Sequence, residues 1–186
     1  MASANMKDVK RRIKSVESTK QITKAMQLVA SSKLRKAKEK ADKARPFFDT
    51  LYSTMSDIAA RNNDFTSKFT AKRAVKKALL IVVAGDRGLA GGFNSNILKM
   101  ALARVEELKS EGIEIEILPV GKKAVDFFEK RNFTISQKYI GIGEQIDIYD
   151  AMKITDEIVH SYLHREFDKV ELLYTTFVPA IMQKQK

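Results

Sequence analysis

Ala78-Leu-Leu-Ile-Val-Val-Ala84 is a continuous apolar run, and Gly85-Asp-Arg-Gly-Leu-Ala-Gly-Gly92 follows it directly. An unbroken run of this kind is typical of a central strand that is covered on both faces. The glycine-rich segment predicts a tight turn, after which we expect a helix over residues 95–111 with Asn94 or Ser95 as its N-cap. Gly112 predicts the end of that helix. The sequence therefore indicates a strand, a turn and a helix at the start of an α/β domain.

Further strands and helices alternate along the rest of the chain. Ile113-Glu-Ile-Glu-Ile117 predicts a strand with one face near water or at a sheet edge. A short helix over 121–131, a strand over 134–140, a helix over 147–165 and a strand over 170–178 are expected after it. Strands that alternate with helices imply a parallel sheet with right-handed crossovers. We expect this α/β domain to occupy residues 77–186.

The region before this domain is strongly basic and has no glycine. Residues 1–46 carry 14 Lys and Arg against 4 Asp and Glu, so +10 of the chain's formal net charge of +11 lies there. Apolar residues recur at helical spacing in a narrow stripe, as in a coiled-coil seam. We expect a long helix over residues 1–61, with a kink or an interruption at Pro46, and then a linker over residues 62–76. The stripe consists of Val9, Ile13, Val16, Ile22, Met26 and Val29.

The glycine-rich turn invites comparison with nucleotide-binding loops, because a helix N-terminus after such a turn is a natural anion site. Its glycines match neither G-x-G-x-x-G nor G-x-x-x-x-G-K-[ST], and no acid for a ribose follows the next strand. We therefore expect no bound nucleotide or other cofactor. The glycines would serve a tight turn, or the turn would display Asp86 and Arg87 to another protein.

Other arrangements that could carry chemistry are weak. Asp156, His160 and His164 are spaced four residues apart, which could hold zinc, but the chain has only these two histidines and no cysteine. We expect a solvated helix face there and no metal. No Ser/His/Asp or paired-carboxylate arrangement indicates a catalytic residue.

Three kinds of partner could explain the basic helix. A nucleic-acid arm would bind through counterion release, although no aromatic residue precedes Phe47 to stack on bases. A helix on a membrane surface would need a bulky apolar face that is missing here. A coiled-coil arm fits the narrow stripe, with the basic faces turned to acidic protein or to solvent. The residues favour the coiled coil and leave the nucleic-acid arm as the alternative.

Two long motifs resemble one protein family. Arg12-Ile-Lys-Ser-Val-Glu-Ser-Thr-Lys-Gln-Ile-Thr-Lys-Ala-Met-Gln-Leu-Val-Ala-Ser-Ser-Lys-Leu-Arg-Lys-Ala37 closely resembles the N-terminal helix of the gamma subunit of rotary ATP synthases. The segment Gly85-Asp-Arg-Gly-Leu-Ala-Gly-Gly-Phe-Asn94 resembles the family's second characteristic motif, which also stands between the first strand and its helix. The resemblance covers essentially the whole chain. The family's C-terminal helix is expected to be absent.

The resemblance implies an α/β fold in which a long N-terminal helix, half of an antiparallel coiled coil, is joined to a Rossmann-like parallel-sheet domain. It implies a non-catalytic rotor shaft that couples proton or sodium flow through a membrane ring to ATP synthesis or hydrolysis. The implied partners are the catalytic alpha/beta-type hexamer, an epsilon-type subunit and the membrane c-ring, and not nucleic acid. The complex would lie on the cytoplasmic face of a bacterial-type cell membrane.

The same resemblance implies which residues contact partners. It places residues 22–36 where the shaft passes the catalytic subunits, with Met26 on the apolar stripe. Lys33, Arg35 and Lys36 would face an acidic lever segment of those subunits, and Arg87 would contact the same lever region. Exposed ion pairs are each worth only about 0–1 kcal/mol, so such contacts could be exchanged as the shaft turns.

Overall fold

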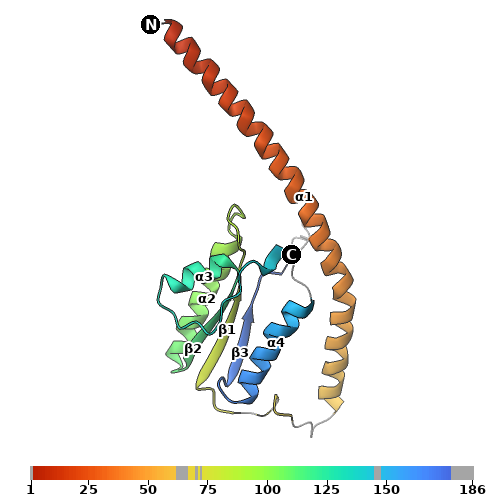
Figure 1. Cartoon of the computed structure of the whole chain (residues 1–186). Helices are drawn as coiled ribbons and strands as arrows, with labels where there is room; N and C mark the ends of the chain where they lie inside the picture. The colour runs from red at the N-terminus through yellow and green to blue at the C-terminus, as the bar shows by residue number, and fades with distance from the viewer. Residues whose placement is uncertain (1, 62–66, 70, 72, 145–147, 177–186) are drawn as a thin grey trace, which may run out of the picture. The chain divides into compact units, whose positions relative to one another are not determined.

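The computed structural model describes residues 2–61, 67–69, 71, 73–144 and 148–176 (Figure 1). The chain divides into two compact units, Met1–Phe65 and Thr66–Lys186. Each unit has its own architecture, because the first is a single helix and the second is a sheet covered by helices.

The first unit is α1 (Ala2–Arg61), a helix of 60 residues. At 1.5 Å per residue, a helix of this size is about 90 Å long. Pro46 lies inside α1, so the helix continues through this residue and is not interrupted there. The proline has no N–H to donate to the carbonyl four residues earlier, and the Thr50 hydroxyl donates to the Pro46 carbonyl at 2.8 Å.

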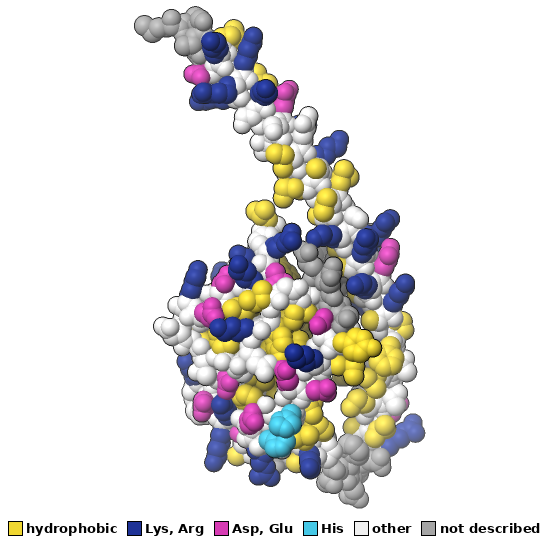
Figure 2. Space-filling model, viewed as in Figure 1, with side chains coloured by type: hydrophobic (Ala, Val, Ile, Leu, Met, Phe, Trp, Pro, Cys, Tyr) yellow, Lys and Arg dark blue, Asp and Glu magenta, His cyan; other side chains and the backbone are white. Residues whose placement is uncertain are grey.

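The apolar stripe of α1 is open to solvent. Its side chains from Val9 to Val29 are 45–67% exposed, and Figure 2 shows apolar side chains between Lys and Arg along the helix. Proteins seldom leave a contiguous apolar surface of this kind bare unless it meets a partner. The stripe is thus available as a seam for another helix.

The second unit is built on a parallel sheet of three strands, β1 (Lys77–Val83), β2 (Glu114–Val120) and β3 (Lys169–Leu173). Their order is β2-β1-β3, with Leu80 beside Ile117 in one neighbour and beside Glu171 in the other. The apolar run that predicted a central strand is β1, and its residues from Ala78 to Val82 are buried. The prediction of an α/β class with a parallel sheet is confirmed.

Helices cover both faces of this sheet (Figure 1). Leu80 and Val82 pack on one face with residues of α2 (Phe93–Ser110) and α3 (Lys122–Glu129). Leu79 and Ile81 point to the other face, where Ile158 of α4 (Ile148–Leu163) packs against their cluster. A short 3₁₀ helix, η1 (Ile142–Glu144), precedes α4. Successive side chains of β1 point to opposite faces of the sheet, so the strand contributes to a hydrophobic core on each face.

Residues 134–140 do not form the strand that the sequence suggested. They make only two isolated bridges to β2, Ile117 to Ile135 and Val120 to Tyr139. A parallel ladder begins there, because Ile117 N donates to Thr134 O at 2.9 Å and Ser136 N donates to Ile117 O at 3.0 Å. The next donor along this edge would be residue 119, which is Pro and has no N–H. Pro119 thus interrupts the ladder, and the pairing resumes beyond it, where Tyr139 N donates to Pro119 O at 3.2 Å and Gly121 N donates to Tyr139 O at 2.7 Å.

The start of α2 and the end of β3 also differ from the expected boundaries. The N-cap of α2 is Gly92, which makes no side-chain capping bond, so the expectation of Asn94 or Ser95 was wrong. The last strand was expected over 170–178, but β3 ends at Leu173, and residues 177 and 178 lie outside the described residues.

Gly121 joins β2 to α3 and lies against the end of β1. Its φ is +95°, and a Cβ there would stand 2.1 Å from the Ala84 carbonyl oxygen. Backbone hydrogen bonds hold this close approach: Ala84 N donates to Val120 O at 2.9 Å, and Lys123 N donates to Gly85 O at 3.0 Å. Only glycine fits, because both the conformation and the contact exclude a side chain.

We expect Gly121→Ala to destabilise the second unit by about 3 kcal/mol or more, because it adds backbone strain to a clash with backbone. The rate of amide hydrogen exchange in β1 is the suitable measurement, because it reports the stability of the second unit without a contribution from α1. Gly88→Ala is the control, because a Cβ on Gly88 would meet only Lys123 Cε, at 4.0 Å, and should change stability by less than about 1 kcal/mol. Equal effects of the two substitutions would contradict this account.

Candidate functional site

Four of the five residues expected to contact partners lie on α1. Lys33 follows Met26 by seven residues, or about two turns, so the two side chains share one side of the helix. Lys36 lies about 80° around the helix from Met26. Arg35 follows Met26 by nine residues, or about two and a half turns, and therefore lies on the opposite side. The helix thus distributes the expected contacts around its circumference.

These side chains are exposed, and Met26 itself is 53% exposed. Arg35 Nε lies 3.9 Å from Glu39 Oε1, with side chains that are 75% and 63% exposed. A pair so exposed contributes about 0–1 kcal/mol and is screened by salt. The Arg35 guanidinium can therefore be taken over by a partner carboxylate at little cost.

The fifth residue, Arg87, lies in the turn between β1 and α2, in the other unit. The carboxylate of Asp86 holds this turn: its Oδ1 accepts hydrogen bonds from Lys122 N at 2.8 Å and from Gly141 N at 3.0 Å. The Gly141 N–H is the main reason that the pKa of Asp86 is lowered below its ordinary value. The carboxylate ties the turn to the start of α3 and to the backbone beside η1.

Asn94 closes the other end of the turn. Its side-chain oxygen accepts from Gly85 N at 2.8 Å, and its side-chain nitrogen donates to Arg87 O at 3.1 Å. The same amide therefore fixes the start of the turn and the backbone of the residue expected to contact a partner. This role replaces the expected N-cap role of Asn94.

The tip of the turn displays Arg87 and Leu89. The Leu89 side chain is 97% exposed, and its φ is +60°, a conformation that non-glycine residues adopt at a cost. An exposed apolar side chain on strained backbone points to a contact surface. Sequence reasoning paired Asp86 with Arg87 for display, but the structure turns Asp86 inward. Sequence reasoning did not identify Leu89, because a single apolar residue in a turn forms no periodic pattern.

The candidate zinc ligands do not gather into a site. The His160 and His164 rings stack with centroids 3.9 Å apart, and His164 Nδ1 lies 2.8 Å from the His160 carbonyl oxygen. His164 already lies beyond the end of α4. Within the described part of the chain, no group of three His, Cys, Asp or Glu side chains could hold a metal ion.

None of the described helices is both long and apolar enough to cross a membrane.

Comparison with known proteins finds a clear match. The family model described as ATP synthase matches residues 5–186. The ATP synthase gamma chain of Ruminococcus albus is 54% identical over 181 residues, which cover 97% of this chain and 63% of that protein. The gamma chain of Pelotomaculum thermopropionicum is 39% identical over 97% of this chain and 62% of its own length. A gamma chain described as sodium ion specific, from Acetobacterium woodii, is 39% identical over 96% of this chain and 58% of its own length. The chain therefore spans about 60% of the length of these relatives.

We expect Asp86→Ala to loosen the turn and cost about 1–2 kcal/mol, because two backbone donors lose their acceptor. The amide resonances of residues 85–94, Lys122 and Gly141 should shift, while those of β3 should not. Because the pKa of Asp86 is lowered, this stabilisation is present at neutral pH and is lost as the pH falls below the ordinary Asp value.

Asp126→Ala provides the control, since Asp126 is half-buried on α3 and its side chain makes no hydrogen bond within the described residues. If Asp86→Ala leaves the resonances of the turn where they are in the unchanged protein, the carboxylate does not hold the turn.

Proposed function

The chain belongs to the ATP synthase gamma-chain family, and from this premise we propose that it forms part of the central rotor shaft of an ATP synthase. In this role it is a non-catalytic subunit. It couples the flow of protons or sodium ions through a membrane ring to ATP synthesis or hydrolysis in a catalytic hexamer. Its rotation would bring the distant catalytic sites in turn to different nucleotide affinities, which is coupling between sites through a rigid element.

The observation that carries the proposal is α1, a continuous helix of 60 residues whose apolar stripe is open. A rod of about 90 Å can transmit rotation only if it resists bending, and a second helix along the stripe would supply that stiffness. The apolar stripe would thus serve the coiled coil, while the basic faces would serve the surrounding subunits.

The proposed partners are the alpha/beta-type hexamer, an epsilon-type subunit and the membrane c-ring. Met26, Lys33, Arg35, Lys36 and Arg87 are the proposed contacts with the hexamer. The different directions of the α1 side chains support contact with a surrounding ring, because a binding site on one side would need them on one face. The complex would be held at the cytoplasmic face of a cell membrane through the c-ring.

We expect the chain to be retained by a purified alpha/beta-type hexamer in size-exclusion chromatography at physiological salt, and not by duplex DNA of random sequence. Lys33→Gln combined with Lys36→Gln should weaken retention by the hexamer, by up to about fivefold for each pair lost. Lys38→Gln combined with Lys40→Gln is the control, since it removes the same charge from the same helix outside the proposed contacts. Retention by DNA alone would instead favour the basic arm as a nucleic-acid binder.

A second test concerns coupling. Arg87→Glu should lower ATP-driven ion pumping by about fivefold or more in a complete ATP synthase that carries the substitution, because it places a carboxylate against an acidic lever. Its melting temperature should stay close to that of the unchanged protein, because the Arg87 side chain is exposed. Lys99→Glu on α2 changes the charge equally at an exposed position and should leave pumping unchanged. Normal pumping by Arg87→Glu would mean that Arg87 only shapes its turn.

A further inference from the structure

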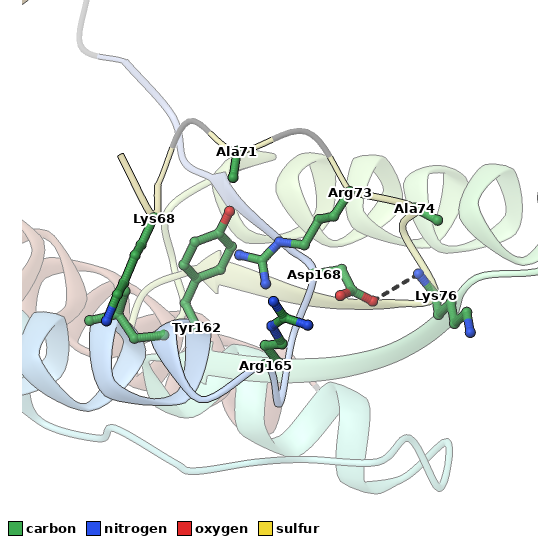
Figure 3. Close-up of a pocket in the computed structure, with 9 residues that line it drawn as sticks. Lys68, Ala71, Arg73, Ala74, Lys76, Tyr162, Arg165 and Asp168 are labelled. Atoms are coloured by element: carbon green, nitrogen blue, oxygen red, sulfur yellow. Dashed lines mark hydrogen bonds between the residues drawn. The ribbon is translucent and has the colours of Figure 1, made fainter. Parts of the chain in front are cut away.

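A basic hollow lies in the second unit, away from the turn that carries Arg87 (Figure 3). Its volume is about 590 Å³, and it is bounded by the segment before β1, the end of α4 and the residues that lead into β3. Four cationic side chains line it, and Asp168 is the one acid among the lining residues. The cations are Lys68, Arg73, Lys76 and Arg165.

Asp168 offsets only part of this charge, because a single carboxylate lies among four cations. Its Oδ2 accepts hydrogen bonds from Lys76 N at 2.9 Å and Lys77 N at 3.1 Å, and these bonds lower its pKa. Within the described residues, none of the four cations of the hollow forms an ion pair with a carboxylate. A concave surface that keeps an excess of positive charge attracts an anion from solution.

Arg73 extends its guanidinium group into the hollow. Its Nε is covered by protein atoms and has no hydrogen-bond partner within the described residues, so an anion in the hollow would meet the terminal nitrogens of the group. The guanidinium carbon lies 4.0 Å from the centroid of the Tyr162 ring, which fixes the direction of the donors. Figure 3 shows the guanidinium groups of Arg73 and Arg165 pointing into the same space, between Tyr162 and Asp168. Two cations that converge in this way repel each other unless an anion lies between them.

Arg165, the second arginine that points into the hollow, has an unfavourable backbone conformation. Its φ is +63°, directly after the last turn of α4, where glycine is the usual residue. Arg165 N donates to Tyr162 O at 3.2 Å, and Glu166 N donates to Ser161 O at 3.0 Å, so the chain must turn at this residue. An arginine at this position has backbone strain that glycine would avoid. Its side chain places a positive charge in the hollow.

We propose that this hollow is a binding site for a phosphate group, either as a free ion or as the headgroup of an anionic phospholipid. The two guanidinium groups offer the planar donor pairs that match phosphate oxygens. Tyr162 is already stacked with Phe69, with ring centroids 6.0 Å apart, as well as with Arg73. Because both partners of the ring are protein side chains, it is not available to stack on a nucleotide base. The site is separate from the proposed contacts of the shaft and does not depend on them.

Titration of the full chain with inorganic phosphate tests the site, with the side-chain Nε–H resonances of Arg73 and Arg165 as the readout. These resonances should shift to saturation, and signals from arginines of α1 should not. Arg73→Gln should weaken binding by about tenfold or more, because one of the two guanidinium groups is lost. Arg165→Gly should weaken binding similarly while it keeps or raises the melting temperature, because it relieves the backbone. A purely structural role for Arg165 does not predict that combination.

Arg12→Gln combined with Arg45→Gln is the control for net charge, since both arginines lie on α1, and it should change phosphate binding by less than about twofold. Vesicles of phosphatidylglycerol, compared with phosphatidylcholine, distinguish the source of the phosphate: shifts of the same two resonances with vesicles alone identify a lipid headgroup, and shifts with free phosphate alone identify the ion. If neither ligand shifts them, or if an acidic peptide does so and phosphate does not, the proposal is overturned.

Discussion

The contact between Gly121 and the Ala84 carbonyl is the constraint on which the second unit depends. It brings together the ends of two neighbouring strands, β1 and β2, where both strands lead into loops. The turn after β1 can then place Asp86 under the first amide of α3. Any residue larger than glycine would separate the strand ends, and the turn that carries Arg87 would lose its support. A position without a side chain thus determines where the Arg87 side chain stands.

The sequence alone was sufficient to predict those elements whose residue pattern is long and regular. The unbroken apolar run identified β1 as the central strand, and the stripe from Val9 to Val29 identified a long helix. Burial and periodicity determine such elements over many residues, so an error at one position has little effect. The expected helix over 95–111 and the observed α2 (Phe93–Ser110) differ only at their ends, where a single hydrogen bond decides the boundary.

Features that depend on a contact between distant residues could not be predicted in this way. Pro119 interrupts the outer ladder of β2 only because its missing N–H falls on the edge that faces residues 134–140. Asp86 is turned inward by amides that follow it by 36 and 55 residues. The basic hollow combines a region read as a linker with Arg165, far along the chain. Neither segment has a pattern of its own, so the convergence of their charges is a product of the fold.

The molecule uses positive charge in two physically different ways. Along α1 the cations are exposed and spread around the helix, so each contact is weak, screened by salt and readily exchanged. Such a surface could slide past a succession of acidic partners without settling on one, as the proposed rotor shaft would. In the hollow the cations converge on one space. A concave surface concentrates the field of the charges that line it, so this surface is suited to hold a single anion in one position. The two arrangements share residue types and differ in curvature and burial, which is why composition alone could reveal the charge but not its two uses.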